Sequence, residues 1–170
     1  MEQEKSRYDL HQNDPTDGEY RNFLSQILDP LLANLQPNSK GLDFGSGPGP
    51  TLAIMLNEKG HDIEIYDPFY HDYPDKLDRR YDFLTCTEVV EHFGDPARSW
   101  MQIKNAVKTG GIIGVMTSLF HDNLSFENWY YKNDLTHVAF YCEYTFKKIA
   151  NMFDFEICQI DNPVVIFKHG

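Results

Sequence analysis

The sequence contains little cysteine. Its 170 residues include three cysteines, Cys86, Cys142 and Cys158, and no two of them are spaced as C-x-x-C. The odd number leaves at least one cysteine outside any disulfide scheme. All three lie in apolar segments, so we expect buried free thiols and a reducing, cytoplasmic setting.

Long apolar runs and positive charge are also scarce. No segment approaches the roughly 18 consecutive apolar residues of a membrane-spanning helix, and no signal peptide is recognisable, so we expect a soluble chain with no membrane partner. The 15 Lys and Arg residues face 26 Asp and Glu residues, which gives a net charge of −11. This charge makes nucleic acid an unlikely partner, because phosphates would be repelled. Lys76, Arg79 and Arg80 nevertheless form a local basic group.

What is present is the composition of a folded domain. Hydrophobic residues make up 41% and aromatic residues 14% of the chain. A chain of this length can bury a substantial core as one domain. Residues 1–19 are polar and are expected to form a separate segment, followed by a single domain over residues 20–170.

Apolar periodicity predicts alternating helices and strands along that domain. One helix begins at Tyr20 and is expected to be kinked or interrupted by Pro30. Another follows Asp95-Pro96 and is expected to end at Gly110-Gly111. Further helices are expected at residues 51–58 and 143–152, and strands at residues 41–44, 61–67, 81–87, 112–118, 155–160 and 164–169. This order predicts an α/β, Rossmann-like three-layer sandwich, with a mainly parallel sheet and a C-terminal antiparallel hairpin.

The segment "LDFGSGPGP", residues 42–50, places a glycine-rich turn between a strand and a helix. Such a turn lets the backbone approach a ligand closely, although a tight turn with no ligand has the same pattern. Two carboxylates favour a ligand. Asp43 lies inside an apolar strand, where an unpaired carboxylate is costly. Asp67 ends the next strand, about twenty residues after the glycines, where it can accept both hydroxyls of a ribose.

These motifs together resemble those of a known family. "LDFGSGPG" followed by Asp67 resembles the nucleoside-binding motif of class I S-adenosylmethionine-dependent methyltransferases of the small-molecule type. "YDFLTCTEVVEHFGDP" and "VKTGGIIGVMTS" resemble that family's fourth-strand motif and the lead into its fifth strand, and "THVAFYCEYTFKKIANMFDFEI" resembles its C-terminal segment. The resemblance covers roughly residues 20–168.

The resemblance implies S-adenosylmethionine as cofactor and a set of residues that bind it. Gly45 and Gly47 would let the backbone approach the methionine part, and Asp43 would orient the turn and the ammonium group. Asp67 would bind the ribose, and Phe69 either packs on the adenine or belongs to the core. The full set is Asp43, Gly45, Ser46, Gly47, Gly49, Asp67, Pro68, Phe69, Thr87 and Glu88.

The segment after Asp67 departs from the family. Only fourteen residues separate Asp67 from Asp82, where the family fits a helix and its third strand. We therefore expect the third strand to be reduced or absent. The acidic residue that binds adenine after that strand has no clear counterpart, and Asp72 and Asp75 are the substitutes the sequence offers.

Acidic residues and histidines cluster after the strand at residues 81–87. Glu88, Glu91 and His92 are spaced i, i+3, i+4, which predicts one face of a single helical turn, and His137 is the obvious fourth group. Two carboxylates and two imidazoles suit a divalent ion such as Mg²⁺, Mn²⁺ or Zn²⁺. The set resembles the metal site of the ubiquinone-pathway O-methyltransferases and of the small-RNA 2′-O-methyltransferases.

Two other interpretations of this cluster stay open. The same run occurs in class I methyltransferases that use no metal, where the first Glu caps the helix and the His packs locally. In the other interpretation, His137 is either the catalytic base that accepts a proton from the methyl acceptor or a residue that orients the acceptor, and His92 is a further catalytic candidate.

Two further segments are candidates for the wall of the site. Between residues 119 and 137 the aromatic residues form either an acceptor pocket or packing over the sheet edge; they are Phe120, Phe126, Trp129, Tyr130 and Tyr131. Residues 1–19 are a candidate lid, with Tyr8, His11 and Tyr20 as its contacts.

The sequence therefore predicts an enzyme that transfers a methyl group from S-adenosylmethionine to an oxygen or nitrogen of a small-molecule acceptor. One alternative is methylation of a nucleic acid or a protein, which the charge of −11 disfavours. Another is a module that binds the cofactor without catalysis, which the shortened segment after Asp67 motivates. The sequence indicates no oligomeric state.

Overall fold

The computed structural model describes residues 14–170, so Tyr8 and His11 lie outside the described residues. The described part forms a six-stranded sheet with the order β2-β1-β3-β4-β6-β5. The strands are β1 (Lys40–Phe44), β2 (Asp62–Tyr66), β3 (Tyr81–Thr87), β4 (Val107–Met116), β5 (Phe155–Asp161) and β6 (Val164–His169). The helices are α2 (Gly18–Leu32), α3 (Thr51–Glu58), α4 (Pro96–Ala106) and α5 (Glu143–Phe153).

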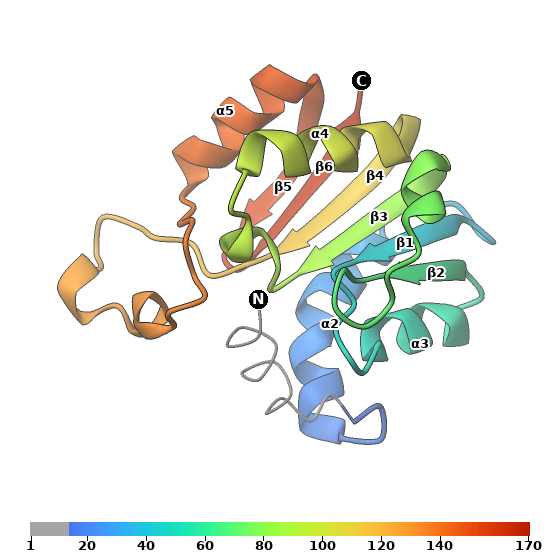
Figure 1. The fold of residues 1–170 in the computed structure, drawn as a ribbon, viewed down its shortest axis with the longest axis horizontal. Helices are drawn as coiled ribbons and strands as arrows, with labels where there is room; N and C mark the ends of the chain where they lie inside the picture. Colours follow the sequence, from blue (N-terminus) through green and yellow to red (C-terminus); the bar gives the residue numbers. More distant parts are fainter. Residues whose placement is uncertain (1–13) are drawn as a thin grey trace.

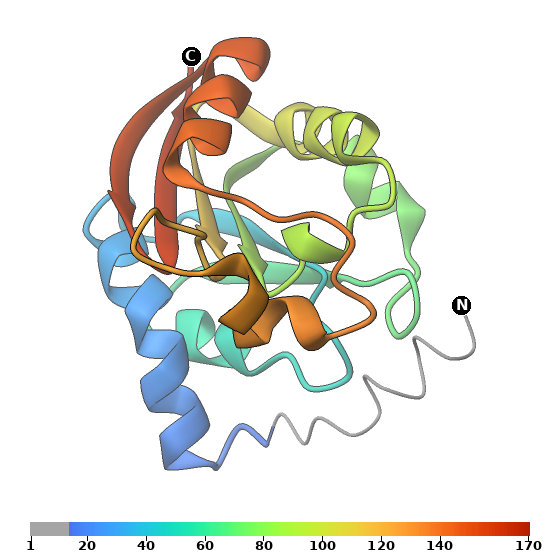
Figure 2. The ribbon, with the colours of Figure 1, turned by 90° about the vertical axis from the view of Figure 1, so that its left-hand side faces the viewer.

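The sheet is parallel over its first four positions and antiparallel at its last two. β1 pairs parallel with β2 and β3, and β3 pairs parallel with β4. β6 pairs antiparallel with both β4 and β5, as a hairpin at the C-terminus of the chain. Helices α2 and α3 lie on one face and α4 and α5 on the other (Figures 1 and 2). The predicted three-layer sandwich is confirmed.

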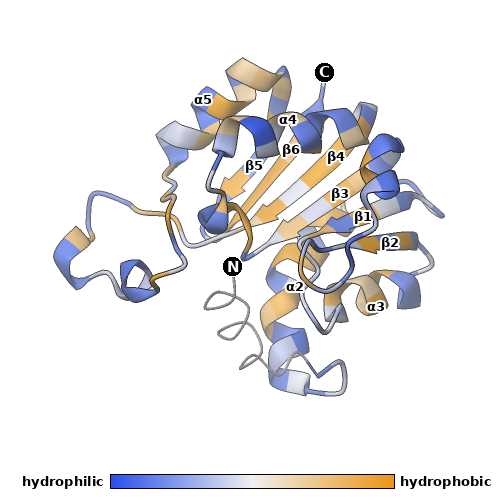
Figure 3. Cartoon of the chain, in the orientation of Figure 1, coloured by the Kyte–Doolittle hydropathy of each residue, from blue (hydrophilic) through white to orange (hydrophobic). Residues whose placement is uncertain are grey.

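The central strands are buried on both faces, because each face is covered by a helical layer. On β3, Phe83 belongs to the core under α2 and α3, whereas its neighbour Leu84 belongs to the core under α4 and α5. Ile112 and Ile113 alternate in the same way on β4. Strands buried on both faces tend toward continuous apolar runs, and in Figure 3 the hydrophobic colour is clearest along β4 and β6.

The boundary between α4 and β4 lies earlier than the sequence predicts. Helix α4 ends at Ala106, and the next residue, Val107, already pairs with Tyr81 across β3. The residues before Gly110, predicted as helical, therefore belong to a strand that is extended by tertiary pairing. The Lys108 ammonium holds this extension through an ion pair of 2.7 Å with the Asp82 carboxylate of β3.

Pro30 does not interrupt α2, so one of the two effects predicted for it, an interruption, is wrong. The helix begins after Asp17, whose carboxylate accepts a hydrogen bond of 2.8 Å from the Glu19 backbone N–H, and it continues to Leu32. A proline removes one helical hydrogen bond. Pro30 lies in the last turn, where burial of Leu28 and Leu31 holds the helix against the sheet.

The third strand of the family is absent, as predicted. Between β2 and β3 the chain forms an isolated bridge from Asp67 to His71 and a short 3₁₀-helix, η1 (Pro74–Asp78). Two members of the basic group expected here, Lys76 and Arg79, pair with acidic side chains. The Arg79 guanidinium lies 2.7 Å from both the Glu64 and the Asp75 carboxylates, and the Lys76 ammonium lies 3.9 Å from Glu64.

The three cysteines are free, but they are not all buried. Cys86 is buried in β3 and Cys142 is half-buried. Cys158 is exposed because β5 is the outermost strand of the sheet, so the prediction of burial was wrong for this residue. Among residues 14–170, no helix combines the length and the apolar character needed to cross a membrane.

Candidate active site

A cavity of about 940 Å³ lies at the carboxyl ends of the parallel strands. Strand β2 lies on one side of β1 and strand β3 on the other, so the strand order reverses at β1. Open α/β sheets bind ligands at such a reversal. The predicted cofactor, base and metal residues all line this cavity: Asp43, Gly45, Ser46, Gly47, Gly49, Asp67, Pro68, Phe69, Thr87, Glu88, Glu91, His92 and His137.

The turn after β1 requires glycine at two positions. Gly45 has a φ of +81° and Gly47 a φ of +63°, a region that residues with a side chain rarely adopt. A Cβ atom on Gly45 would also lie 2.5 Å from a methyl carbon of Val89. The backbone N–H groups of Gly45 and Ser46 both donate to the Tyr66 carbonyl, at 2.8 and 3.2 Å. The turn is thereby fixed to the end of β2.

Asp43 is a buried carboxylate with one described hydrogen-bond donor. It is 4% exposed, and its Oδ1 accepts a hydrogen bond of 2.7 Å from the Thr85 hydroxyl. Burial raises the pKa of Asp43 to about 6, the Thr85 hydrogen bond opposes that rise, and the charge of Asp67 adds to it. A cationic ligand group in the cavity would compensate this unfavourable charge.

Asp67 organises the two loops on either side of the cavity. Its Oδ2 accepts a hydrogen bond of 2.9 Å from the Gly47 N–H, across from the glycine turn. Its Oδ1 accepts from the backbone N–H groups of Phe69 and Tyr70, at 2.8 and 3.2 Å. Carboxylate oxygens have about four lone-pair positions in total. Asp67 therefore holds the turn and still has acceptor capacity for ligand hydroxyls.

Two buried hydroxyl groups beside the turn have no hydrogen-bond partner within the described part of the chain. They are Ser46 Oγ and Thr87 Oγ1, at the ends of β1 and β3. Buried polar atoms are nearly always hydrogen-bonded in native proteins. Because both residues line the cavity, a polar ligand is the natural partner for them.

The substitutes considered for adenine recognition do not line the cavity. Asp72 and Asp75 are both exposed, and Asp75 pairs with Arg79 instead. Tyr70 lines the cavity next to Phe69. Further lining residues, which the sequence did not single out, come from the segment between η2 and α4 and from the first two turns of α4. These are Phe93, Gly94, Arg98, Ser99 and Gln102.

Glu88, Glu91 and His92 do not share one face of a helical turn, contrary to prediction. Glu88 has a φ of +52°, and only residues Val90–His92 form a short 3₁₀-helix, η2. The Glu88 N–H donates instead to the Met116 carbonyl of β4, at 2.8 Å, which turns the chain before the helix begins. Burial and the charge of Glu91 raise the pKa of the Glu88 carboxyl above its ordinary value.

Glu91 is fully buried, and hydrogen bonds reach both of its carboxylate oxygens. Oε2 accepts from the Thr117 hydroxyl at 3.0 Å, and Oε1 accepts from the Tyr131 hydroxyl at 2.5 Å. Its backbone carbonyl accepts from the N–H groups of Val138 and Ala139, at 2.9 and 3.0 Å. Glu91 therefore ties the loop over residues 119–141 to the end of β3.

Two histidines face Glu91 with a defined tautomer. His92 Nδ1 lies 3.0 Å from the Thr136 carbonyl oxygen, and His137 Nδ1 lies 2.7 Å from the Tyr131 carbonyl oxygen. Because a carbonyl only accepts hydrogen bonds, both Nδ1 atoms carry a proton, and each Nε2 keeps its lone pair when the ring is neutral. Burial lowers the pKa of His137, which favours the neutral ring.

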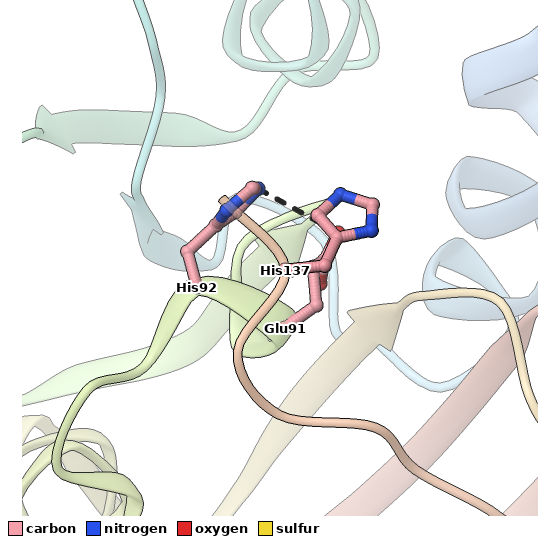
Figure 4. A group of neighbouring side chains, drawn as sticks. All are labelled: Glu91, His92 and His137. Carbon is pink, nitrogen blue, oxygen red and sulfur yellow. Dashed lines mark ion pairs between the residues drawn. The ribbon is translucent and has the colours of Figure 1, made fainter. Parts of the chain in front are cut away.

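Ligand atoms of Glu91, His92 and His137 lie within 4.8 Å of one another, close enough to hold one metal ion. Figure 4 shows the two imidazoles next to each other, one from η2 and one from the loop, with Glu91 reaching toward them. His92 Nε2 lies 4.0 Å from Glu91 Oε1. The predicted fourth ligand, Glu88, does not belong to this close group.

The aromatic stretch divides between packing and the cavity wall. Phe120, Phe126 and Trp129 pack on one another, with ring centroids 5.5 to 6.1 Å apart, and they do not line the cavity. Tyr130 and Tyr131 do line it. Of the predicted lid contacts, Tyr20 lies on α2 and lines the cavity, and burial with the charges of Asp43 and Glu88 raises the pKa of Tyr20 to about 12.

A family model described as a methyltransferase domain matches residues 17–160. Because this match covers most of the chain, the chain belongs to the methyltransferase domain family, which confirms the family predicted from the motifs.

Curated relatives are similar to about half of the chain. A ubiquinone biosynthesis O-methyltransferase from Erwinia tasmaniensis is 31% identical over 85 residues, which is 50% of this chain and 35% of that protein. A counterpart from Aeromonas salmonicida is 26% identical over 91 residues, 54% of this chain and 38% of that protein. The matched part thus spans little more than a third of these curated relatives.

Among solved structures, a 1,6-didemethyltoxoflavin-N1-methyltransferase from Burkholderia thailandensis, with 1,6-didemethyltoxoflavin and S-adenosylhomocysteine bound, superimposes with a TM-score of 0.67 at 13% identity. This match covers 86% of this chain and 77% of that chain. At such identity, the likeness shows the shared fold.

Proposed function

We propose that the protein transfers a methyl group from S-adenosylmethionine to an oxygen or nitrogen of a small-molecule acceptor. The observation that carries this proposal is the pair of buried carboxylates, Asp43 and Asp67, at the ends of adjacent strands around a glycine turn that lines a cavity. The family supports it, since the curated relatives are named O-methyltransferases and a structural neighbour holds S-adenosylhomocysteine.

The charge of the cavity fits a cationic cofactor. Its lining in the described chain includes five acidic side chains and one basic side chain, Arg98; the acidic ones are Asp43, Asp67, Glu88, Glu91 and Asp134. S-adenosylmethionine carries a sulfonium and an ammonium group, and nearby carboxylates stabilise both. In this proposal Asp43 faces the ammonium, Asp67 the ribose, and Ser46 and Thr87 supply their unpartnered hydroxyls to the cofactor.

His137 is the residue we assign as catalytic base, with His92 beside it. The lone pair of the acceptor atom forms a bond to the methyl carbon while the carbon–sulfur bond breaks, and the electron pair of that bond stays on sulfur. The proton of the acceptor passes to Nε2 of His137, which holds its lone pair because Nδ1 donates to the Tyr131 carbonyl. Positioning of the two reactants supplies much of the remaining rate enhancement.

A divalent metal at Glu91, His92 and His137 is the second candidate for activating the acceptor. The donor set fits, since one carboxylate and two imidazoles suit Mn²⁺ or Zn²⁺, and each imidazole is oriented by a backbone carbonyl next to its Nδ1 atom. When bound, such an ion would act as a Lewis acid and lower the pKa of an acceptor hydroxyl.

Small molecules are the proposed acceptors rather than nucleic acids. The net charge is −11, and Lys76 and Arg79 are paired with Glu64. The free thiols support the proposed cytoplasmic setting. A module that binds the cofactor without catalysis is distinguished by turnover: incubation with S-adenosylmethionine and a metabolite library yields S-adenosylhomocysteine only from an active enzyme.

Addition of S-adenosylhomocysteine is expected to raise the melting temperature of the wild-type chain. At a hundredfold excess over Kd, ligand binding adds about 2.7 kcal/mol of stability, which corresponds to roughly 5 to 10 °C for a chain of this size. Asp67→Ala is expected to abolish the shift. Asp72→Ala, a matched change at an exposed aspartate outside the cavity, is expected to retain it. Absence of a shift in wild type contradicts the cofactor assignment.

Titration with Mn²⁺ tests the metal alternative. Thermal stability and the electron paramagnetic resonance signal of free Mn²⁺ are expected to report binding by wild type. Glu91→Gln keeps the shape of the side chain but removes its charge, and we expect at least a tenfold weaker affinity. Glu127→Gln, at an exposed position outside the cavity, is the control. Equal affinities for both variants would rule out this site.

A further inference from the structure

Tyr131 lies at the centre of the hydrogen bonds on the acceptor side of the cavity. It belongs to the 3₁₀-helix η4 (Tyr130–Asn133) and is 6% exposed. Its hydroxyl oxygen lies 2.5 Å from Glu91 Oε1, 3.0 Å from Thr117 Oγ1 and 3.2 Å from Glu88 Oε2. The phenol is therefore within hydrogen-bond distance of three polar groups from two strand ends.

The contact between the Tyr131 hydroxyl and Glu91 orients the Glu91 carboxylate. A phenol has one proton to donate, and the shortest contact is to Glu91 Oε1. The Thr117 hydroxyl donates to the other oxygen of the same carboxylate, Oε2, at 3.0 Å. With a donor on each oxygen, the plane of the Glu91 carboxylate is fixed. The Glu91 side chain is fully buried, so solvent does not reach the carboxylate to replace these donors.

The backbone and ring of Tyr131 hold the neighbouring histidine. Its carbonyl oxygen lies 2.7 Å from His137 Nδ1, and its ring centroid lies 4.2 Å from the imidazole centroid. The carbonyl sets the tautomer, which leaves the lone pair on Nε2, and the ring contact limits rotation of the imidazole. One residue thus contacts both Glu91 and His137, whose ligand atoms lie within 4.8 Å of each other.

We propose that Tyr131 is a positioning residue for the transfer reaction: its hydroxyl orients Glu91 toward His137 and so fixes the geometry of the acceptor side. The proposal rests on the proposed function, because it assigns the step that Tyr131 supports. It is independent of whether Glu91 and His137 act on a proton or on a metal ion. It places Tyr131 in the chemical step, because the shortest contact of its hydroxyl is with Glu91 and its carbonyl and ring contact His137, whereas its contact with Glu88, a predicted cofactor residue, is longer at 3.2 Å.

Tyr131→Phe is the substitution that isolates the hydroxyl. The ring packs against Trp129 with a centroid distance of 5.4 Å and against His137, and phenylalanine keeps both contacts. The backbone carbonyl is also retained. Tyr144→Phe removes a hydroxyl from a tyrosine that is 65% exposed on α5 and outside the cavity, so it is the matched control.

Steady-state kinetics and histidine nuclear magnetic resonance together test the proposal. For Tyr131→Phe we expect kcat to fall about 10- to 100-fold, the range for residues that orient a reacting group from behind. The KM for S-adenosylmethionine and the thermal shift with S-adenosylhomocysteine are expected to stay within twofold of wild type. The Cε1–H resonance of His137, assigned by its loss in His137→Asn, is expected to move in Tyr131→Phe and not in Tyr144→Phe.

Three outcomes would overturn the proposal. One is a kcat within twofold of wild type, and another is an unmoved His137 resonance. The third is an equal loss of kcat and of the S-adenosylhomocysteine shift, which would mark a purely structural role. If wild type turned over no acceptor, the proposed function would fail, whereas the His137 resonance would still decide whether the Tyr131 hydroxyl orients this side chain.

Discussion

Asp43→Asn is expected to be more stable than the wild-type chain at neutral pH and yet to bind the cofactor much more weakly. The wild-type carboxylate is 4% exposed, and burial is the main cause that raises its pKa to about 6. Asparagine removes the buried charge but keeps an oxygen for the Thr85 hydroxyl, which donates at 2.7 Å. The gain is expected to be about 1 to 3 kcal/mol, at about 1.4 kcal/mol per pKa unit.

The contribution of Asp43 to folding stability depends on pH with a definite sign. The folded-state pKa of Asp43, about 6, lies above its ordinary value of 3.8, so the folded chain binds more protons than the unfolded chain between these values. The contribution of Asp43 to the free energy of unfolding therefore falls as pH rises from about 4 to about 6 and levels off above that. The advantage of Asp43→Asn is expected to be absent near pH 3.5 and complete near pH 7.5, measured by chemical denaturation without cofactor.

Cofactor affinity is expected to change in the opposite direction. Removing one partner of a buried charge pair costs about 2 to 5 kcal/mol, so Asp43→Asn is expected to weaken binding of S-adenosylhomocysteine at least about thirtyfold, measured by calorimetry. Asp82→Asn is the matched control on the same sheet. The Lys108 ammonium lowers the pKa of Asp82, so the control is expected to lose stability at neutral pH and to bind normally. Unchanged affinity in Asp43→Asn would contradict the role assigned to it.

His137→Asn is expected to lower kcat by about 100- to 10,000-fold, the contribution of a positioned acid or base. Asparagine can still donate a hydrogen bond to the Tyr131 carbonyl, as Nδ1 does at 2.7 Å, but it has no counterpart of Nε2. The S-adenosylhomocysteine shift is therefore expected to persist. His121→Asn, an exposed histidine in the same loop, is expected to behave as wild type.

The pH profile of the wild-type enzyme checks the same assignment. Burial lowers the pKa of His137 below its ordinary value of 6.5, so the neutral, proton-accepting ring predominates at neutral pH. We expect kcat/KM to rise with pH below 6.5 and to level off by about pH 7.

A loss of cofactor binding in His137→Asn, or a kcat of that variant within tenfold of wild type, would contradict a catalytic role for His137.

The cofactor side could be predicted from sequence because its residues follow strand ends directly. Asp43, Gly45 and Asp67 lie in or next to short apolar runs, and parallel strands bring their carboxyl ends to one edge. A local pattern therefore carried enough information. The Thr85 partner of Asp43 was missed, although a threonine inside the apolar run of β3 was a comparable signal.

The acceptor side was predicted less well because it depends on contacts between distant segments. The spacing of Glu88 and Glu91 indicated a helical turn. The Glu88 N–H instead donates to the Met116 carbonyl of β4, and Glu88 has a positive φ that does not fit a helix. The contact between Tyr131 and Glu91 joins residues 40 positions apart. Neither the strand contact nor the loop contact has a signature within a short window of sequence.

The absent third strand leaves β2 at the edge of the sheet, where unpaired backbone groups can recruit a strand from another molecule. The shortened connection occupies this edge. The Lys76 ammonium donates to the Ile65 carbonyl at 3.1 Å, and Arg79 and Lys76 both pair with Glu64. Charged side chains thus take over part of the role of a neighbouring strand, and the segment that shortens the fold also protects it against edge-to-edge aggregation.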